Sequence, residues 1–392
     1  MSDATRPEII VNVFGKTDVG RTREHNEDSF VVADLTTNVA SLQPSVRTHR
    51  VGPKGTLFMV ADGMGGAAAG EIASQMATEV VLRELRAHWT SLQDPTPEEF
   101  ARCLKKAAQS ANQQIHSYAS SHQEYRGMGT TATIAGLLDD TLYLCQIGDS
   151  RGYLVRDGVA RQITKDQSLM QKLIEAGELT EEEAAQSERR NIILQALGPE
   201  ATIKVDLTHQ QLRRGDTLML CSDGLSGQIT KDDIAQVCTE EKDLVQACKR
   251  LIDLANDAGG PDNITVIIAR FDGEGLSDAA DEDEVGHRVF SLPEGGQMTP
   301  PMPMERITEQ ATAPMGSGSR STVPVGDQPA LMVEETTEPL DDVDPATAET
   351  LDSIDTSRLQ PGRKSRGMAI AIGLLVVLVA LAGWYGYRMF RN

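Results

Sequence analysis

Acidic residues follow apolar segments at several places in this sequence. The apolar run at residues 57–61 ends in Asp62-Gly63, and the run at 218–221 ends in Ser222-Asp223-Gly224. Asp and Glu normally occupy exposed faces, so carboxylates placed directly after buried strands invite a chemical explanation. Others lie at predicted strand ends or turns. The candidate carboxylates are Glu27, Asp28, Asp62, Asp149, Asp223 and Asp262.

Carboxylates that converge without His or Cys form an all-oxygen site. Such a site suits hard cations such as Mg²⁺ or Mn²⁺ and does not suit zinc. Two of these ions about 3.5–4 Å apart polarise a phosphoryl oxygen and turn a bridging water into a nucleophile near neutral pH. The pattern therefore predicts hydrolysis of a phosphate ester without a covalent intermediate.

The neighbours of these carboxylates fit the same chemistry. Gly63, Gly65 and Gly66 allow sharp bends and let carbonyl oxygens approach an ion closely. Arg23 offers a planar fork of donors for a phosphate group. Taken singly, each motif also has an ordinary structural interpretation, because Asp-Gly is a common turn and Gly-Asp-Ser-Arg suits a hairpin loop.

The elements that position these residues come in blocks. Residues 57–61 and 218–221 are predicted to be buried strands. Further strands are expected at 130–138, 141–147 and 152–155, and helices at 70–87, 97–120 and 244–256. Blocks of strands and helices favour an α+β domain with antiparallel sheets over a doubly wound parallel sheet.

Composition divides the 392-residue chain into three parts. Residues 1–271 alternate apolar segments with turn signals and are long enough for one domain with a full core. Residues 272–362 carry 20 Asp or Glu against 4 Arg, and 10 of the 17 prolines. Such a segment cannot bury enough apolar surface to offset its ordering entropy, so we expect a disordered acidic linker.

Residues 363–392 form a basic flank followed by an apolar stretch. Residues 368–387 contain no charge, and 20 residues in a helix span about 30 Å, the thickness of a bilayer core. Trp384, Tyr385 and Tyr387 stand where aromatic side chains meet a membrane interface. We expect one C-terminal transmembrane helix that anchors the protein to the cell membrane.

Charge and cysteine use indicate where the domain works. No apolar segment of signal-peptide type stands near Met1, so the catalytic domain is expected to remain cytoplasmic. None of the five cysteines forms a CxxC pair, which agrees with a reducing compartment. The net charge of −21 argues against nucleic acid as a partner.

Six motifs, taken in order, resemble the bacterial members of the metal-dependent serine/threonine protein phosphatases of type 2C. The resemblance covers about residues 12–271. The motifs are Arg23 with Asn26-Glu27-Asp28, then Val60-Ala-Asp-Gly-Met-Gly-Gly66, Gly129-Thr-Thr-Ala132, Gly148-Asp-Ser-Arg151, Ser222-Asp-Gly224 and Gly260-Pro-Asp-Asn-Ile-Thr265. It implies a four-layer α-β-β-α sandwich of two antiparallel sheets, with a metal centre in a cleft at one edge.

The resemblance also implies roles for the principal ligands. Asp62 would bridge two ions, Mn²⁺ or Mg²⁺, and the carbonyl of Gly63 would bind one of them. Asp223 and Asp262 would bind the other.

Further residues take supporting roles by the same resemblance. Glu27 would act through water, and Asp28 would bind metal-associated water. Arg23 would hold the substrate phosphate, and Asp149 would help bind a third, weaker ion. Animal and plant members place His after Asp-Gly, whereas this chain has Met64, as bacterial relatives commonly do. The variable flap would lie at residues 165–190.

The implied substrates are phosphoserine and phosphothreonine on proteins, above all on bacterial serine/threonine kinases and their targets. Two alternatives compete. Cys145 and Arg151 have the Cys-x5-Arg spacing of tyrosine phosphatases, but Cys145 lies within a predicted strand, where a thiolate is disfavoured. The other alternative is a catalytically silent scaffold that binds phosphoproteins at the membrane.

Overall fold

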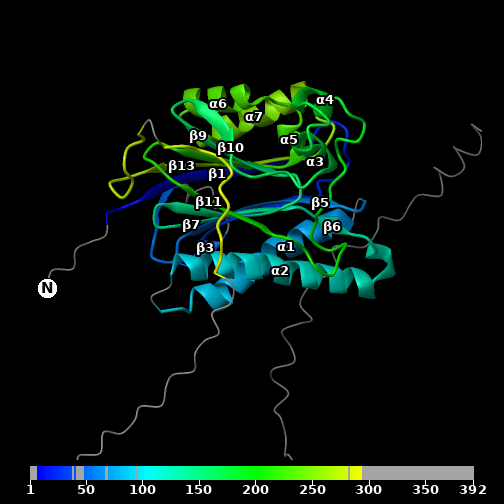
Figure 1. Cartoon of the computed structure of the whole chain (residues 1–392), viewed down its shortest axis with the longest axis horizontal. Helices are drawn as coiled ribbons and strands as arrows, with labels where there is room; N and C mark the ends of the chain where they lie inside the picture. The colour runs from blue at the N-terminus through cyan, green and yellow to red at the C-terminus, as the bar shows by residue number, and fades with distance from the viewer. Residues whose placement is uncertain are drawn as a thin grey trace, which may run out of the picture. The chain divides into compact units, whose positions relative to one another are not determined.

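Two antiparallel sheets stack face to face, and helices cover the outer face of each (Figure 1). The computed structural model describes residues 7–37, 39–40, 48–66, 69–93, 96–280 and 283–293. The order of layers is helix, sheet, sheet, helix. The α+β fold with two antiparallel sheets is therefore confirmed.

The first sheet has the strand order β10-β9-β12-β13-β1-β4. Its strands are β1 (Ile10–Asp18), β4 (Thr48–Arg50), β9 (Arg151–Arg156), β10 (Val159–Gln162), β12 (Thr217–Cys221) and β13 (Ile264–Asp272). Strand β12 lies between β9 and β13 and is antiparallel to both, with Cys221 opposite Arg151 and Val266. These three strands have charged residues at or near both of their ends.

The second sheet has the order β11-β8-β7-β5-β2-β3, with β6 paired to β5. Its strands are β2 (Asp28–Asp34), β3 (Val39–Ala40), β5 (Thr56–Met64), β6 (Gly129–Thr130), β7 (Ala132–Leu138), β8 (Thr141–Ile147) and β11 (Asp206–Gln211). Strand β5 is buried along its first six residues, in agreement with the apolar run that predicted it.

Helices α1 (Ala69–Glu84) and α2 (Pro97–Ser121) cover the second sheet, and α6 (Lys231–Glu240) and α7 (Leu244–Asp257) cover the first. Short elements complete the chain: η1 (Leu85–Trp89), η2 (Gln123–Tyr125), α3 (Leu169–Glu175), α4 (Glu181–Ala185) and α5 (Asp223–Ser226). Helix α2 begins at a capping box, in which Thr96 and Glu99 satisfy each other's backbone N–H groups.

Three buried apolar clusters join the four layers. One fills the space between the sheets and includes Phe58, Leu154 and Phe271. A second lies under α1 and α2, around Trp89 and Phe100. The third joins α6 and α7 to the first sheet. Each sheet is thus buried on both faces, which explains why its strands read as nearly continuous apolar runs.

The folded domain continues beyond residue 271, where we expected the linker to begin. Leu276 is buried in the core between the sheets. Val289 bridges to Thr208 of strand β11, and Phe290 packs edge-on against Tyr143 with ring centroids 5.1 Å apart. Residues 273–280 and 283–293 are acidic, yet Leu276 is buried and Val285, Phe290 and Leu292 are partly buried against the core, a feature that average composition conceals.

The predicted transmembrane stretch at 368–387 and most of the predicted linker lie outside the described residues. Within the described ranges, no helix is both long and apolar enough to cross a bilayer.

Candidate metal centre

Asp28 and Asp62 face each other across two strands of the second sheet. They are register partners at the ends of β2 and β5, which brings their Cα atoms to within about 4.5–5.5 Å. Their separation of 34 positions in the sequence hides this pairing. Two carboxylates are thereby fixed side by side at one edge of the sandwich.

Thr130 and Thr131 fix the backbone of Asp62. The Thr131 hydroxyl oxygen accepts a hydrogen bond from the Asp62 N–H at 3.0 Å. The Thr130 hydroxyl and the Thr131 N–H both donate to the Asp62 carbonyl at 2.8 Å. The Gly129-Thr-Thr-Ala132 motif therefore positions Asp62, a role that the sequence alone did not indicate.

Asp223 and Asp262 come from the first sheet. Asp223 stands at the start of α5, one residue after the end of β12, and Asp262 is separated from the start of β13 by Asn263. Burial and the charges of Asp28 and Asp223 raise the pKa of Asp62, so the two sheets bring their carboxylates close together. Ser222 adds a bond from its hydroxyl to Asp28 Oδ2 at 2.8 Å. Four of the predicted carboxylates thus converge where the sheets meet.

Asn263 holds the loop that carries Glu27. Its Oδ1 accepts from the Glu27 N–H at 2.8 Å, and its Nδ2 donates to the carbonyls of Val19 and His25 at 3.0 and 2.9 Å. All three of these hydrogen bonds are directed at the loop of residues 19–27. The second residue of the Asp262-Asn263 pair is therefore a structural clamp, and the sequence analysis had missed it.

Gly63 is glycine because the backbone packs tightly there. A Cβ atom at this position would lie 2.2 Å from the Gly70 carbonyl oxygen and 2.5 Å from that of Glu27. Gly70 in turn makes room for Glu27, whose Oε2 would meet a Cβ at 2.2 Å. The helix α1 can approach the carboxylates only because both residues lack a side chain.

Burial and mutual repulsion raise the pKa values of the carboxylates. Burial raises the pKa of Asp28 to about 7, aided by the charges of Asp223 and Asp262. Burial also raises the pKa of Asp149 to about 7 and that of Asp62 well above its usual range, with neighbouring carboxylates adding to each shift. Together these carboxylates form a field of negative charge that strongly favours cations.

Two buried carboxylate oxygens show where in the cluster a cation is needed. Asp28 Oδ1 and Asp149 Oδ1 are inaccessible to solvent and have no hydrogen-bond partner among the described residues. Buried polar atoms are normally satisfied, so such atoms call for an ion or water. Oxygen donors of this kind suit Mg²⁺ or Mn²⁺. The residues present therefore fit the divalent cations that the sequence predicted.

The side chains are not already arranged as a closed ligand set. In the part of the chain that the structure describes, no three His, Cys, Asp or Glu side chains are grouped so that they could hold a metal ion. Individual metal assignments to Asp62, Gly63, Asp223, Asp262, Glu27, Asp28 and Asp149 remain predictions.

Arg23 lies at the rim of this site. Its guanidinium is about half exposed and donates from Nη2 to Asp262 Oδ2 at 2.8 Å. One edge of the fork is thereby held by the carboxylate cluster, and the rest can face a solvent-borne phosphate. This placement is compatible with the predicted role in substrate binding.

The Asp149 loop is tied to the flap. Arg151 makes a bidentate pair with Asp166, with contacts of 2.7 to 3.1 Å. The Gln167 side chain accepts from the Gly148 N–H at 3.1 Å, and the Gln167 N–H donates to the Gly148 carbonyl at 2.8 Å. The start of the flap is thus bonded to residues flanking Asp149.

Cys145 does not have the environment of a nucleophile. It lies in strand β8, fully buried, and burial raises the pKa of its thiol to about 12. Arg151, which gave the Cys-x5-Arg spacing, is engaged by Asp166. A neutral, inaccessible thiol cannot attack phosphate, so the tyrosine-phosphatase alternative has no support in this geometry.

Comparison with known proteins supplies relatives of the whole domain. The family model described as "Protein phosphatase 2C" matches residues 41–265. The serine/threonine phosphatase stp of Listeria monocytogenes is 38% identical over 257 residues, which cover 66% of this chain and 94% of that protein. Protein phosphatase PhpP of Streptococcus pneumoniae is 36% identical over 259 residues, with 66% and 96% covered.

Solved structures agree in fold. The Mycobacterium tuberculosis serine/threonine phosphatase PstP/Ppp superposes with a TM-score of 0.55 at 35% identity, covering 67% of this chain and 98% of that one. The catalytic domain of PstP solved in complex with two manganese ions gives 0.55 at 34% identity, with 67% and 99% covered. The similarity therefore extends over nearly the whole length of each of these two solved chains.

Proposed function

This chain belongs to the protein phosphatase 2C family and is a serine/threonine protein phosphatase, and from that premise we propose that it hydrolyses phosphoserine and phosphothreonine with two divalent ions, Mn²⁺ or Mg²⁺, in the carboxylate cluster. The observation that carries the proposal is the set of buried carboxylates with raised pKa values and two unpaired oxygens, Asp28 Oδ1 and Asp149 Oδ1. A relative's structure in complex with two manganese ions supports the number of ions.

The roles proposed for the residues are those that the resemblance to the family implies. Asp62, Gly63, Asp223 and Asp262 are proposed to hold the ions, with Glu27 and Asp28 acting through water and Asp149 binding a third, weaker ion. When bound, the ions would supply a water of lowered pKa and neutralise charge on the phosphoryl group. Arg23, at the rim, is proposed to orient the phosphate and so to restrict the direction of attack.

The cellular setting is a proposal from the sequence. The uncharged stretch at 368–387 would anchor the enzyme in the cell membrane, with the catalytic domain cytoplasmic and the acidic segment as a tether. Phosphorylated serine/threonine kinases and their targets would then be the substrates, met at raised effective concentration near the membrane. Deleting residues 363–392 should lower dephosphorylation of membrane-bound substrates in cells. Unchanged phosphorylation would contradict the tether.

The decisive experiment compares hydrolysis of a phosphothreonine peptide by wild type, Asp62→Asn and Asp253→Asn, with and without MnCl₂. Residues 1–303 include all the residues that the structure describes, and the similarity to the Listeria monocytogenes phosphatase covers 94% of that protein, so this fragment is suitable. We expect metal-dependent turnover, lost at least about 100-fold in Asp62→Asn, as for other groups aimed at the reacting centre. Asp253, an exposed partner of Lys249, is the matched control.

The alternative of a silent scaffold makes the opposite prediction. A folded wild-type domain that binds Mn²⁺ by calorimetry yet turns over no phosphopeptide would support phosphoprotein binding without catalysis. Turnover that is independent of added and bound metal would instead reject the two-ion mechanism while leaving phosphatase activity in place.

A further inference from the structure

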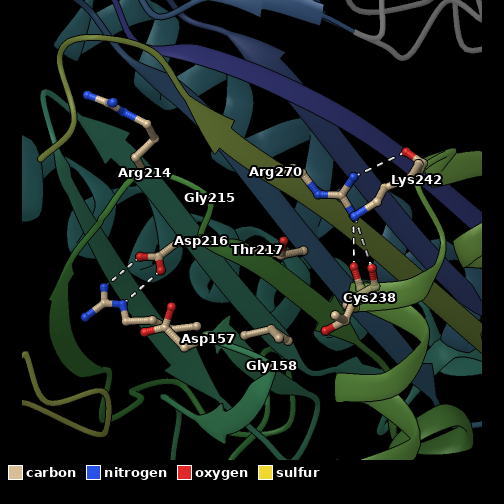
Figure 2. A pocket seen from close by; sticks show the side chains of 12 residues that line it. Asp157, Gly158, Arg214, Gly215, Asp216, Thr217, Cys238, Lys242 and Arg270 are labelled. Carbon is tan, nitrogen blue, oxygen red and sulfur yellow. Dashed lines mark hydrogen bonds and ion pairs between the residues drawn. The ribbon is translucent and has the colours of Figure 1, made fainter. Parts of the chain in front are cut away.

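A cavity of about 440 Å³ lies at the ends of β9, β12 and β13 opposite the carboxylates (Figure 2). The cations that line this basic cavity are Arg156, Arg214, Lys242 and Arg270. Arg156 pairs with the buried Asp216 at 2.6 Å. Arg214 donates to the Leu276 carbonyl at 3.0 Å, and Arg270 donates to carbonyls of residues 238–242. Three of the four cations of the basic cavity are therefore engaged by the fold.

Arg126 differs from these cations because its guanidinium is unpaired. The side chain is exposed and makes no hydrogen bond or ion pair with another residue of the described ranges. Its backbone is nevertheless fixed, since the Arg126 N–H donates to the Gln123 carbonyl at 3.3 Å. The Met128 N–H donates to the Tyr125 carbonyl at 3.0 Å, and the Tyr125 ring stacks on that of Tyr118 with centroids 5.6 Å apart. An anchored loop thus presents a free cation to solvent.

Arg126 and Arg23 lie on opposite sides of the end of β5. Gly63, whose carbonyl is a predicted metal ligand, stands between two segments there. Its N–H donates to the Glu27 carbonyl at 3.2 Å, and its register partner on the other side is Thr130. Arg23 stands four residues before Glu27, and Arg126 likewise stands four residues before its own contact with this strand. The metal centre is therefore flanked by one arginine that a carboxylate holds and by one that is free.

Three exposed glycines occupy the surface next to Arg126. Gly65 and Gly66 directly follow β5, and Gly127 comes shortly before β6. The two loops touch, because a Cβ atom at Gly65 would lie 3.0 Å from the Met128 Cα. At Gly66 and Gly127, by contrast, a Cβ atom would meet no atom within 4 Å. An extended peptide can approach bare backbone of this kind more closely than a surface covered by side chains.

We propose that Arg126 selects protein substrates that carry an acidic residue three or four positions from the phosphorylated residue. The inference rests on the proposed function, because it names a class of substrate for the same site. The chain from Arg126 to Thr130 spans at most about 14 Å, and an extended peptide rises about 3.3 Å per residue. A carboxylate at that spacing therefore reaches Arg126 when the phosphate lies at the ions beside Arg23.

The charge of the chain makes such a cation selective. The net charge of −21 repels acidic peptides, so a carboxylate that reaches the unpaired Arg126 gains an attraction that the rest of the protein opposes. An exposed ion pair contributes little to binding in absolute terms. It nevertheless discriminates between substrates, because a neutral residue at the same position gains nothing from the cation.

The test compares kcat/KM of the full chain, in detergent with MnCl₂, for phosphothreonine peptides that differ only in flanking charge. Each of two acidic peptides carries Glu at the third and fourth positions on one side of the phosphothreonine and Gln on the other. The neutral peptide carries Gln on both sides. The variants are Arg126→Glu and Arg126→Lys. The matched control is Lys106→Glu, exposed on α2 at about 22 Å along the helix from its end at Ser121.

We expect the wild type to prefer one acidic peptide about threefold over the neutral peptide, mainly through a lower KM, as for one exposed ion pair. This ratio cancels any loss of activity that is common to both peptides. Arg126→Glu should reverse the preference, whereas Arg126→Lys and Lys106→Glu should retain it. The preference should shrink in about 300 mM NaCl, because salt screens exposed charges. Equal kcat/KM for all three peptides in the wild type, or an unchanged preference in Arg126→Glu, would overturn the proposal.

Binding separates this inference from the phosphatase mechanism. Asp62→Asn removes a predicted metal ligand and with it turnover, so dissociation constants of the same labelled peptides can be measured by fluorescence anisotropy in that background. Adding Arg126→Glu should weaken binding of the acidic peptide at least about threefold and that of the neutral peptide by less than about twofold. Equal weakening of both would overturn the selection. A wild type that hydrolyses none of the peptides would contradict the proposed function, while these dissociation constants would still decide the role of Arg126.

Discussion

Strands β9, β12 and β13 carry opposite charges at their two ends. At one end stand Asp149, Asp223 and Asp262, each one or two residues outside a strand. At the other end stand Arg156 and Arg270, within β9 and β13. The same three strands therefore separate an acidic centre from a basic cavity.

The two ends differ in how their charges are satisfied. At the basic end, Asp216 neutralises Arg156, and helix carbonyls accept from Arg270. At the acidic end, the carboxylates repel one another. Buried oxygens of Asp28 and Asp149 have no hydrogen-bond partner among the described residues. Buried charge that is paired stabilises a fold, whereas buried charge left unpaired marks a place that awaits a ligand.

The largest expected effect on the free energy of unfolding is that of Asp216→Ala at the basic end. Arg156 would remain almost fully buried without its carboxylate, a change that costs about 3–5 kcal/mol for buried pairs. Urea denaturation should show this loss in the free energy of unfolding. The double variant Arg156→Met with Asp216→Leu should recover most of it, because no unpaired charge remains. A loss below about 1 kcal/mol in Asp216→Ala would mean that Arg156 finds another partner.

The acidic end should respond to pH in the opposite sense from an ordinary surface. The pKa values of Asp28 and Asp149 are raised to about 7 in the folded protein, so the folded state binds protons more tightly than the unfolded state between about pH 4 and 7. Their contribution to stability is therefore present at low pH and is lost as pH rises through 7. In EDTA, the free energy of unfolding should fall by about 2 kcal/mol for each of the two carboxylates from pH 5.5 to 8.

Metal provides the control for that measurement. Divalent ions bind deprotonated carboxylates, so MnCl₂ should stabilise the domain more at pH 8 than at pH 5.5 and should reduce or reverse the trend. Equal stability at both pH values in EDTA would indicate that another group compensates the charges of the buried carboxylates.

The sequence predicted the acidic end far better than the basic end. Asp62 and Asp223 were singled out because Asp62 directly follows an apolar run and Asp223 follows another after Ser222, and this signal is local. The pairing of Asp28 with Asp62 depends on strand register, and the clamp made by Asn263 depends on a loop 236 positions away, so neither is visible locally.

The basic cavity carried no comparable signal. In the sequence, Arg156, Arg214 and Arg270 look like ordinary strand or turn residues. Only the pairing of β12 with β9 and β13 brings them to one end of the sheet. The same limitation explains the boundary at 271. The acidic composition of the next segment predicted disorder, whereas Leu276 and Phe290 find apolar partners that only the assembled sheets provide.

Removing one carboxylate from the acidic end tests whether its burial destabilises the metal-free domain. In EDTA, Asp62→Asn should stabilise the domain by about 1–2 kcal/mol, because the amide removes a buried charge whose pKa is raised and can donate to a neighbouring carboxylate. In MnCl₂ the same variant should be less stable than wild type. Asp253→Asn should change neither value by more than about 0.5 kcal/mol. Destabilisation of Asp62→Asn in EDTA would show that the negative charge itself holds the fold together.

A third kind of buried polar group belongs to neither end, and it should have the smallest effect. Cys145 lies within β8 as a neutral thiol with its pKa raised to about 12, so it has neither a charge to pair nor a site to serve. Cys145→Ala should lower the free energy of unfolding by about 1 kcal/mol through lost packing. Its kcat/KM for a phosphothreonine peptide, per folded molecule, should equal that of wild type. A loss of activity in Cys145→Ala that is not restored in Cys145→Ser, with both variants folded, would contradict the assignment of catalysis to the carboxylate end alone.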